Sequence, residues 1–286
     1  MIRIDNLAVY NSRPEQGRHR PVLFIHGAGG TGLYWRNYLS YFAREGREAF
    51  AVSLRGHHPS QREEGLAHVT LEDYIEDVEK VIARLGIQNC ALVGHSLGAI
   101  VAQKTAENIS RVGALVTIAG APPFGILPAP DEFNVDLPYS GTLVRTMWGA
   151  MSARPVKPTF AMAEKAFLNN IAANERREVF KMFAAESLVA LYQVAQGYPV
   201  YPSRIKCPRL VIGCARDVLA PPSLQRRLAQ YLDADYIEYE QFAHLPMLES
   251  GWEKSARDVS EWLNEKDRSA FATGMLTKGG MPAVEK

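Results

Sequence analysis

The sequence is poor in cysteine and carries almost no net charge. Its three cysteines, Cys90, Cys207 and Cys214, are an odd number and lie in or beside apolar segments. Reduced core thiols suit this pattern better than a disulfide framework does. The 32 Lys and Arg residues are matched by 31 Asp and Glu residues, so no strong field attracts nucleic acid or an anionic membrane. We therefore expect neither as a partner, and we expect no polyanionic substrate.

Long apolar runs and targeting signals are also missing. No uninterrupted apolar segment reaches the roughly 18 residues that a membrane span requires. The first residues do not combine a basic stretch with an apolar one, as a signal peptide does. These two absences predict a cytoplasmic protein, which we expect to be a monomer or a homodimer acting on a small molecule.

Signals for a metal or a nucleotide cofactor are weak. The glycine-rich run at 27–30 is not followed by the Lys-Ser or Lys-Thr pair of a phosphate-binding loop. His57 and His58 are adjacent in an expected loop, and adjacent residues rarely supply two ligands without further donors at suitable spacing. We therefore expect no metal and no cofactor.

Apolar strand-like runs alternate with helical patterns, which is typical of a mainly parallel sheet covered by helices on both faces. The clearest helical pattern covers 71–85, where the apolar residues recur at three- and four-residue spacing. Thr70 and Asp73 form a capping-box pattern before it, and Gly86 ends it. The strands are expected at 22–25, 49–54, 91–93, 114–118, 210–212 and 236–239.

One serine lies between two glycines where a strand is expected to become a helix. The run is Gly94-His95-Ser96-Leu97-Gly98, which matches the G-x-S-x-G nucleophile elbow. The serine in such a turn holds a strained backbone angle that exposes its hydroxyl, and strand and helix approach so closely that the flanking positions must be small. Five residues match easily by chance, so the pattern needs partners elsewhere in the chain.

Two such partners follow at the ends of later strands. Asp217 lies in a turn after an apolar strand, and His244 lies between a short strand and the last helical segment. The chain order Ser96, Asp217, His244 differs from the orders of the chymotrypsin-like and subtilisin-like proteases. With the strand that runs into the His-Gly turn at 26–27, these residues make the chain resemble the α/β-hydrolase family over about 20–265.

The resemblance implies a fold and a set of catalytic roles. The fold is a doubly wound, mainly parallel sheet of the α/β-hydrolase type with a mostly helical cap. Ser96 is the implied nucleophile, His244 the base and Asp217 the acid, while the backbone N–H groups of Ala28 and Leu97 form the oxyanion hole. Serine at the nucleophile position argues against haloalkane dehalogenases and epoxide hydrolases, which use aspartate there.

The strand rhythm stops after residue 122, where proline-punctuated loops and helical patterns at 160–171 and 176–195 take over. By the resemblance, 123–202 is a cap inserted into a core made of 1–122 and 203–266, and 267–286 is a flexible tail. Apolar cap residues, Phe167 among them, are expected to face the serine. The expected pocket residues are His95, Phe124, Met147, Trp148, Met151, Leu219 and Leu245.

The mainly apolar cap favours an uncharged substrate. The leading expectation is a carboxylesterase-like serine hydrolase that acts on a small to medium, largely apolar ester through an acyl-enzyme. A carbon–carbon bond hydrolase of a ring-cleavage diketone and a lactonase are the alternatives with the same triad. A non-catalytic, ligand-binding member of the fold is the alternative from another class.

Overall fold

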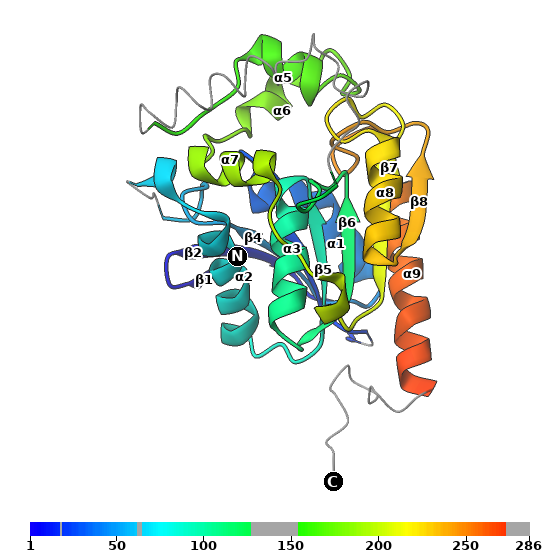
Figure 1. Ribbon diagram of the computed structural model, residues 1–286. Helices are drawn as coiled ribbons and strands as arrows, with labels where there is room; N and C mark the ends of the chain where they lie inside the picture. Colours follow the sequence, from blue (N-terminus) through cyan, green and yellow to red (C-terminus); the bar gives the residue numbers. More distant parts are fainter. Residues whose placement is uncertain (18, 62–64, 127–153, 273–286) are drawn as a thin grey trace.

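The computed structural model describes residues 1–17, 19–61, 65–126 and 154–272. Its strands form one eight-stranded sheet in the order β1-β2-β4-β3-β5-β6-β7-β8 (Figure 1). The pairs β1·β2 and β2·β4 are antiparallel, and all later pairs are parallel. The strands are β1 (Ile2–Ile4), β2 (Leu7–Ser12), β3 (Val22–Ile25), β4 (Ala49–Ser53), β5 (Cys90–His95), β6 (Val112–Ile118), β7 (Arg209–Cys214) and β8 (Asp235–Tyr239).

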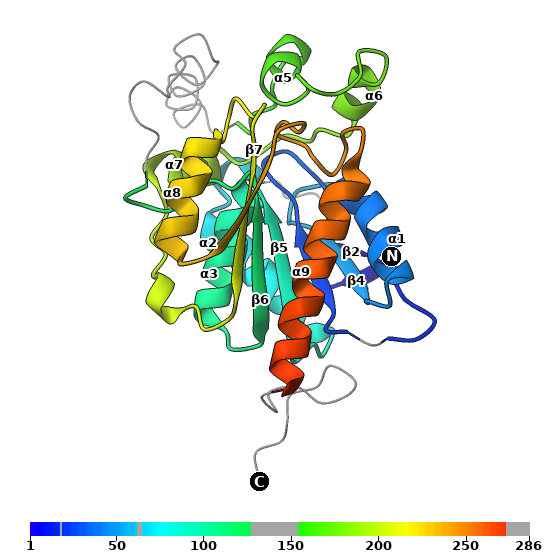
Figure 2. The same ribbon diagram turned by 90° about the vertical axis from the view of Figure 1, so that its right-hand side faces the viewer.

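Helices cover both faces of this sheet, so the predicted α/β class is confirmed. Helices α1 and α9 lie on one face, and α2, α3 and α8 lie on the other (Figure 2). Each face buries its own apolar cluster. The α-helices are α1 (Arg36–Arg44), α2 (Leu71–Arg84), α3 (Leu97–Asn108), α5 (Phe160–Ala166), α6 (Arg176–Lys181), α7 (Leu188–Gln196), α8 (Pro222–Leu232) and α9 (Trp252–Ala272). The short 3-10 turns are η1 (Gly32–Trp35), η2 (Leu66–His68) and η3 (Pro202–Arg204).

Helix α2 begins and ends as its sequence predicts. The Thr70 hydroxyl accepts from the Asp73 N–H at 3.2 Å, and the Asp73 carboxylate accepts from the Thr70 N–H at 2.8 Å. Gly86 follows the helix in the left-handed region at φ 67°, where a side chain would strain the backbone. The apolar residues of the predicted stripe, such as Tyr74 and Val78, are buried against the sheet.

After β6 the chain leaves the sheet and returns in β7, the strand next to β6. The described part of this β6–β7 segment (119–208) carries α5, α6 and α7, which lie beyond one end of the sheet (Figure 1). The helix predicted over 176–195 is in fact two helices. Between them Glu186 pairs with Val156 in an antiparallel bridge, and the Ser187 hydroxyl caps α7 by accepting from the Ala190 N–H.

The predicted start of a flexible tail at residue 267 is wrong. Helix α9 continues through residue 272, and Asp267 is 1% exposed. Its carboxylate forms ion pairs with the buried guanidinium groups of Arg20 and Arg47. The sequence shows no apolar periodicity there because a charged side chain, and not an apolar one, holds this end of the helix. Among the described residues, no helix has both the length and the hydropathy needed to cross a membrane.

Candidate active site

The expected catalytic residues all lie in loops that follow the carboxyl ends of parallel strands. β3 and β5 are neighbours, with Ile25 opposite Gly94, so the turn after β3 lies beside the turn after β5. Asp217 follows β7, and His244 follows β8, the next strand of the sheet. In an open parallel sheet these ends meet at one edge, where ligands bind.

Ser96 holds the strained backbone that an elbow requires, at φ 51° and ψ −121°. Such a conformation costs about 1–3 kcal/mol and persists only where the surroundings fix it. The Ser96 N–H donates to the Ile118 carbonyl at 3.1 Å, and its carbonyl accepts from the Ala121 N–H at 3.0 Å. Leu97 opens α3, so its N–H has no carbonyl partner within the helix and lies at the positive end of the helix dipole.

The two glycines of the motif are required by close packing. A Cβ at Gly94 would lie 2.7 Å from the Ala99 Cα, and a Cβ at Gly98 would lie 2.7 Å from the Ile25 carbonyl oxygen. Both distances are shorter than any normal carbon contact. The sequence argument that strand and helix nearly touch at this turn is therefore confirmed.

Asp217 and His244 are joined by a hydrogen bond in a buried setting. The His244 Nδ1 lies 2.8 Å from the Asp217 Oδ2, and both side chains are almost fully buried. The other carboxylate oxygen of Asp217 accepts from the N–H groups of Leu219, at 2.8 Å, and Ala220, at 3.0 Å. With Oδ2 ionised and acceptor-only, Nδ1 of the imidazole carries the proton, which leaves Nε2 free to act as a base.

Two rings hold His244 against the serine turn. The His95 Nε2–H donates to the His244 carbonyl at 2.7 Å, and the two imidazole rings lie 4.9 Å apart. Burial, and then the neighbouring His244, lowers the pKa of His95 well below its usual value, so His95 stays neutral. On the other side the Phe167 ring lies 5.6 Å from His244. Residue 95 immediately precedes Ser96, so these contacts place His244 beside the elbow.

The turn that carries Ala28 packs directly on the elbow. The Gly30 N–H donates to the Gly27 carbonyl at 3.0 Å and closes the turn. Gly29, at its third position, has φ 63°, as a type II turn requires. A Cβ at Gly27 would lie 2.7 Å from the Ser96 Cβ. The half-buried Ala28 therefore follows a residue that contacts the serine.

His26 is a neutral residue that stabilises this turn by hydrogen bonds. Its Nε2 accepts from the Leu54 N–H at 3.1 Å, so the proton resides on Nδ1, which donates to the Gly27 carbonyl at 2.8 Å. Burial lowers the pKa of His26 to about 3. These two hydrogen bonds give His26 a structural role in the turn.

Two buried glutamates near the site were missed by sequence reasoning. The Glu249 carboxylate accepts from the N–H groups of Ala243, at 2.8 Å, and Leu245, at 3.0 Å, the two residues that flank His244. Burial raises the pKa of Glu249. Glu186 accepts from the Gly29 N–H at 2.9 Å. Neither residue stands in a recognisable motif, and their partners are distant in the chain or in irregular loops.

The expected pocket residues fall into three groups. Phe124 is 67% exposed and Leu219 is half-buried, so both have surface to offer a ligand. His95 and Leu245 are buried next to or within the His244 loop, and their place among the pocket residues stays a prediction. The remaining three, Met147, Trp148 and Met151, lie outside the described residues.

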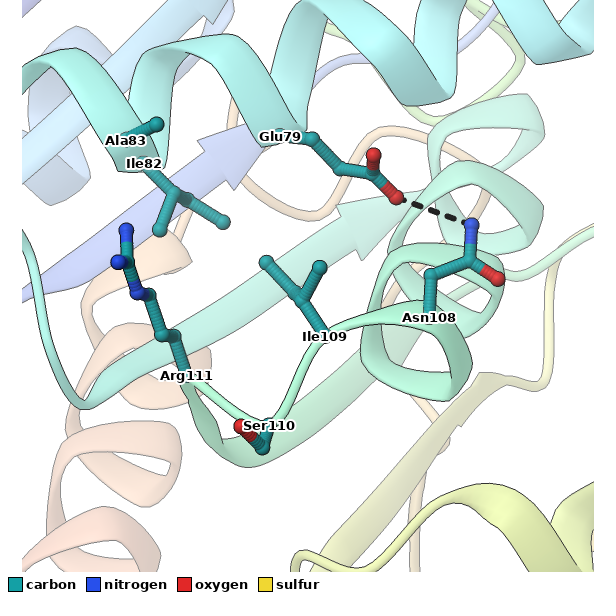
Figure 3. Close-up of a pocket in the computed structure, with 7 residues that line it drawn as sticks. All are labelled: Glu79, Ile82, Ala83, Asn108, Ile109, Ser110 and Arg111. Atoms are coloured by element: carbon teal, nitrogen blue, oxygen red, sulfur yellow. Dashed lines mark hydrogen bonds between the residues drawn. The ribbon is translucent and has the colours of Figure 1, made fainter.

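The described residues show no metal site, and a surface hollow lies elsewhere on the molecule. Among the residues that the structure describes, no three His, Cys, Asp or Glu side chains are placed to hold a metal ion. A hollow of about 430 Å³ lies between the end of α2, which contributes Glu79, and the residues that end and follow α3 (108–111); Asn108 donates to Glu79 at 2.9 Å there (Figure 3). Ser96 lies at the other end of α3, so this hollow is not the site.

Comparisons with known proteins agree with the fold. Protein ABHD8 of Mus musculus is 25% identical over 232 residues, 80% of this chain, and the chain spans about half (52%) of that relative's length. Strigolactone esterase D14 of Arabidopsis thaliana is 26% identical, covering 79% of this chain and 86% of its own. A carboxylesterase structure from Nitrososphaera gargenis superposes with a TM-score of 0.70 at 21% identity, covering 94% and 99% of the two chains. Residues 22–258 match the model of the alpha/beta hydrolase family, and the chain belongs to that family.

Proposed function

We propose that the protein is a serine hydrolase that cleaves a carboxylic ester of a small to medium, largely apolar substrate. One observation carries the proposal: His244 donates from Nδ1 to Asp217 at 2.8 Å and is held by His95 beside the strained Ser96. A buried imidazole in this tautomer presents an unprotonated Nε2. The esterase named among the relatives, D14, supports the same class of reaction.

The proposed reaction proceeds in two steps. His244 takes the hydroxyl proton of Ser96 as the oxygen attacks the ester carbonyl, and Asp217 stabilises the imidazolium that forms. The N–H groups of Ala28 and Leu97 bind the oxyanion, and each such donor is worth about 3–4 kcal/mol. His244 then protonates the departing alcohol and leaves an acyl-enzyme on Ser96. Water, deprotonated by His244, releases the carboxylic acid and restores the serine.

We also propose that 123–202 form a cap over this reaction centre. Two observations support it: α5 and α6 lie beyond the sheet edge that carries the candidate residues (Figure 1), and Phe167 packs on His244. Phe167 is joined by Phe180 and Phe183, whose rings lie 5.8 Å apart. An aromatic wall of this kind favours an uncharged acyl or alcohol group.

The test is the hydrolysis of p-nitrophenyl acetate, butyrate and octanoate by the wild-type protein and by Ser96→Ala. Labelling with a fluorophosphonate, read by intact mass, reports an activated serine independently of substrate choice. Ser40→Ala is the matched control, because Ser40 is an exposed serine on α1. We expect turnover and a single label in the wild-type and control proteins and neither in Ser96→Ala.

The outcomes separate the alternatives. Turnover that depends on Ser96 establishes an esterase, and its chain-length preference measures the acyl pocket. Labelling without turnover contradicts the ester assignment and directs the search to lactones, ring-cleavage diketones or a non-catalytic ligand. Absence of both label and turnover overturns the mechanism and leaves Ser96 a structural residue.

A further inference from the structure

A buried glutamate of the β6–β7 segment contacts the turn that carries Ala28. Glu186 is 3% exposed and lies in the extended stretch between α6 and α7. Its carboxylate accepts four hydrogen bonds, from the Gly29 N–H at 2.9 Å, the His57 Nε2 at 3.2 Å, the Tyr74 hydroxyl at 2.6 Å and the Ser187 N–H at 2.6 Å. The first of these is the contact with the turn.

The same stretch holds the turn from both sides of Gly29. The Ala184 N–H donates to the Gly29 carbonyl at 2.7 Å, while Glu186 accepts from the Gly29 N–H. A Cβ at Gly29 would lie 2.9 Å from the Ala184 carbonyl oxygen, so the stretch and the turn are in close contact. The peptide units on either side of Gly29 are therefore both bonded to the β6–β7 segment.

The charge of Glu186 favours one of two turn types. Types I and II differ mainly by a flip of the middle peptide, here the one between Ala28 and Gly29. In the observed turn its N–H points to the carboxylate. A flip would direct the Ala28 carbonyl at the negative charge and shift the Ala28 backbone, so an ionised Glu186 disfavours it.

The carboxylate is kept ionised by its partners. Burial alone would raise the pKa of Glu186, but the charge of His57 and the donated hydrogen bonds hold it at about 2. Burial lowers the pKa of His57, yet Glu186 outweighs this effect and the pKa lies above its usual value. Both ring nitrogens of His57 face acceptors, the Arg55 carbonyl at 3.0 Å and Glu186 at 3.2 Å. A doubly protonated His57 satisfies both and balances a negative charge that would otherwise oppose an oxyanion formed nearby.

We propose that Glu186 is a positioning residue for the oxyanion hole, acting through its hydrogen bond to the Gly29 N–H. This inference rests on the proposed function, because it assigns Ala28 as an oxyanion donor. According to this inference, the β6–β7 segment does more than enclose the substrate. It also sets the conformation of the Ala28 turn, which stabilises the transition state. The contribution acts on the chemical step and not on substrate binding.

The test compares Glu186→Ala and Glu186→Gln with two controls. Loss of an oxyanion donor costs about 100- to 1,000-fold in kcat, and a displaced donor costs less. We expect Glu186→Ala to lower kcat roughly 10- to 100-fold, with KM changed less than about threefold and with slower fluorophosphonate labelling. Glutamine retains one acceptor oxygen for the Gly29 N–H, so the kcat of Glu186→Gln should lie between those of Glu186→Ala and the wild type.

The controls separate positioning from stability. Tyr74→Phe removes a hydrogen bond to the other oxygen of the same carboxylate, so it should lower the melting temperature and reduce kcat much less than Glu186→Ala does. Glu178→Ala removes an exposed glutamate of α6 and should change neither. If Glu186→Ala does not fold, the kcat of Glu186→Gln is compared with that of Tyr74→Phe. A lower kcat in Glu186→Gln supports the positioning role.

Two results would overturn the inference. One is a wild-type kcat in the folded Glu186 variants; the other is an equal loss of kcat in Tyr74→Phe. Failure of the proposed function is seen separately, as a wild-type protein that neither labels nor hydrolyses any ester. If the wild-type protein labels and hydrolyses an ester and the Glu186 variants keep the wild-type kcat, the positioning role is rejected and the proposed function stands.

Discussion

At the scale of single residues, the half-buried Ser96 combines backbone strain with the role of proposed nucleophile. Its φ of 51° lies in a region where any Cβ clashes with the backbone, and glycine avoids that clash. The strained angle persists because bonds to Ile118 and Ala121 fix the turn. Stability and the proposed presentation of a nucleophile therefore compete at this position.

This competition predicts an order of stability for two inactive variants. Relief of about 1–3 kcal/mol of strain outweighs the entropy cost of glycine, about 0.5–1 kcal/mol. Ser96→Gly should be about 1 kcal/mol more stable than Ser96→Ala in urea unfolding. Ser40, inside α1, gives the control, since glycine there should be about 1 kcal/mol less stable than alanine. The same order at both positions would contradict the strain argument.

Asp217 is predicted to act through the tautomer of His244. Its Oδ1 is already bonded to two backbone N–H groups, so in Asp217→Asn the amide oxygen takes that place and the NH₂ faces His244 Nδ1. Nε2 then carries the proton and cannot accept one from Ser96. We expect kcat to fall about 1,000- to 10,000-fold with little change in the unfolding free energy.

Ester turnover and circular dichroism melts measure these two effects on Asp217→Asn. Asp233→Asn is the matched control, because Asp233 has a 97% exposed side chain and a left-handed backbone that asparagine tolerates. Full activity of Asp217→Asn would place the acid elsewhere.

At the scale of elements, the sequence predicts the helices and strands that neighbouring residues determine. It does not predict the breaks that contacts with distant residues cause. The capping box of α2 and the strand at Val22–Ile25 follow from neighbouring residues. The break between α6 and α7 does not, because its cause is the pairing of Glu186 with Val156 and the bond of Ala184 to Gly29. These partners are far away in the chain, and no periodicity within the segment reports them.

The loop after α5 shows what such distant contacts do for the site. The Asn170 Oδ1 accepts from the Arg216 guanidinium at 3.0 Å, in the loop that carries Asp217. Its Nδ2 donates to the Gln241 carbonyl at 2.9 Å and to Glu249, in the loop that carries His244. One amide thus joins the loops of the proposed acid and base.

Asn170→Ala should therefore loosen both loops together. We expect a loss of about 1–3 kcal/mol in unfolding free energy, because the buried carboxylate of Glu249 and the half-buried Gln241 carbonyl each lose a donor. We also expect kcat to fall about 10-fold, since misplacement by 1 Å can cost about 100-fold. Asn174→Ala changes an exposed asparagine nearby and should be neutral. A kcat equal to the wild type at a lowered stability would limit Asn170 to a structural role.

At the scale of the whole molecule, the candidate site and a buried charge cluster lie at opposite ends of α9. This helix has 21 residues, which corresponds to about 30 Å. It begins just after the His244 loop and carries Asp267 near its other end. There Arg47 donates to Asp267 at 2.9 Å and to the Arg20 carbonyl at 2.6 Å. Because Arg20 precedes β3 and Arg47 precedes β4, these bonds connect α9 to the segments before both strands.

Asp267→Ala should destabilise the protein without changing its chemistry. It leaves Arg20 and Arg47 buried with their charges unpaired, and breaking such a pair costs about 3–5 kcal/mol. Urea unfolding measures this loss, with Glu265→Ala as control because Glu265 is an exposed residue of the same helix. Because Asp267 lies roughly 22 Å along α9 from the end that adjoins the His244 loop, kcat should stay at the wild-type value wherever the variant is folded. A parallel fall of kcat and stability would show that α9 couples the two ends, and that the sheet edge does not fix the site by itself.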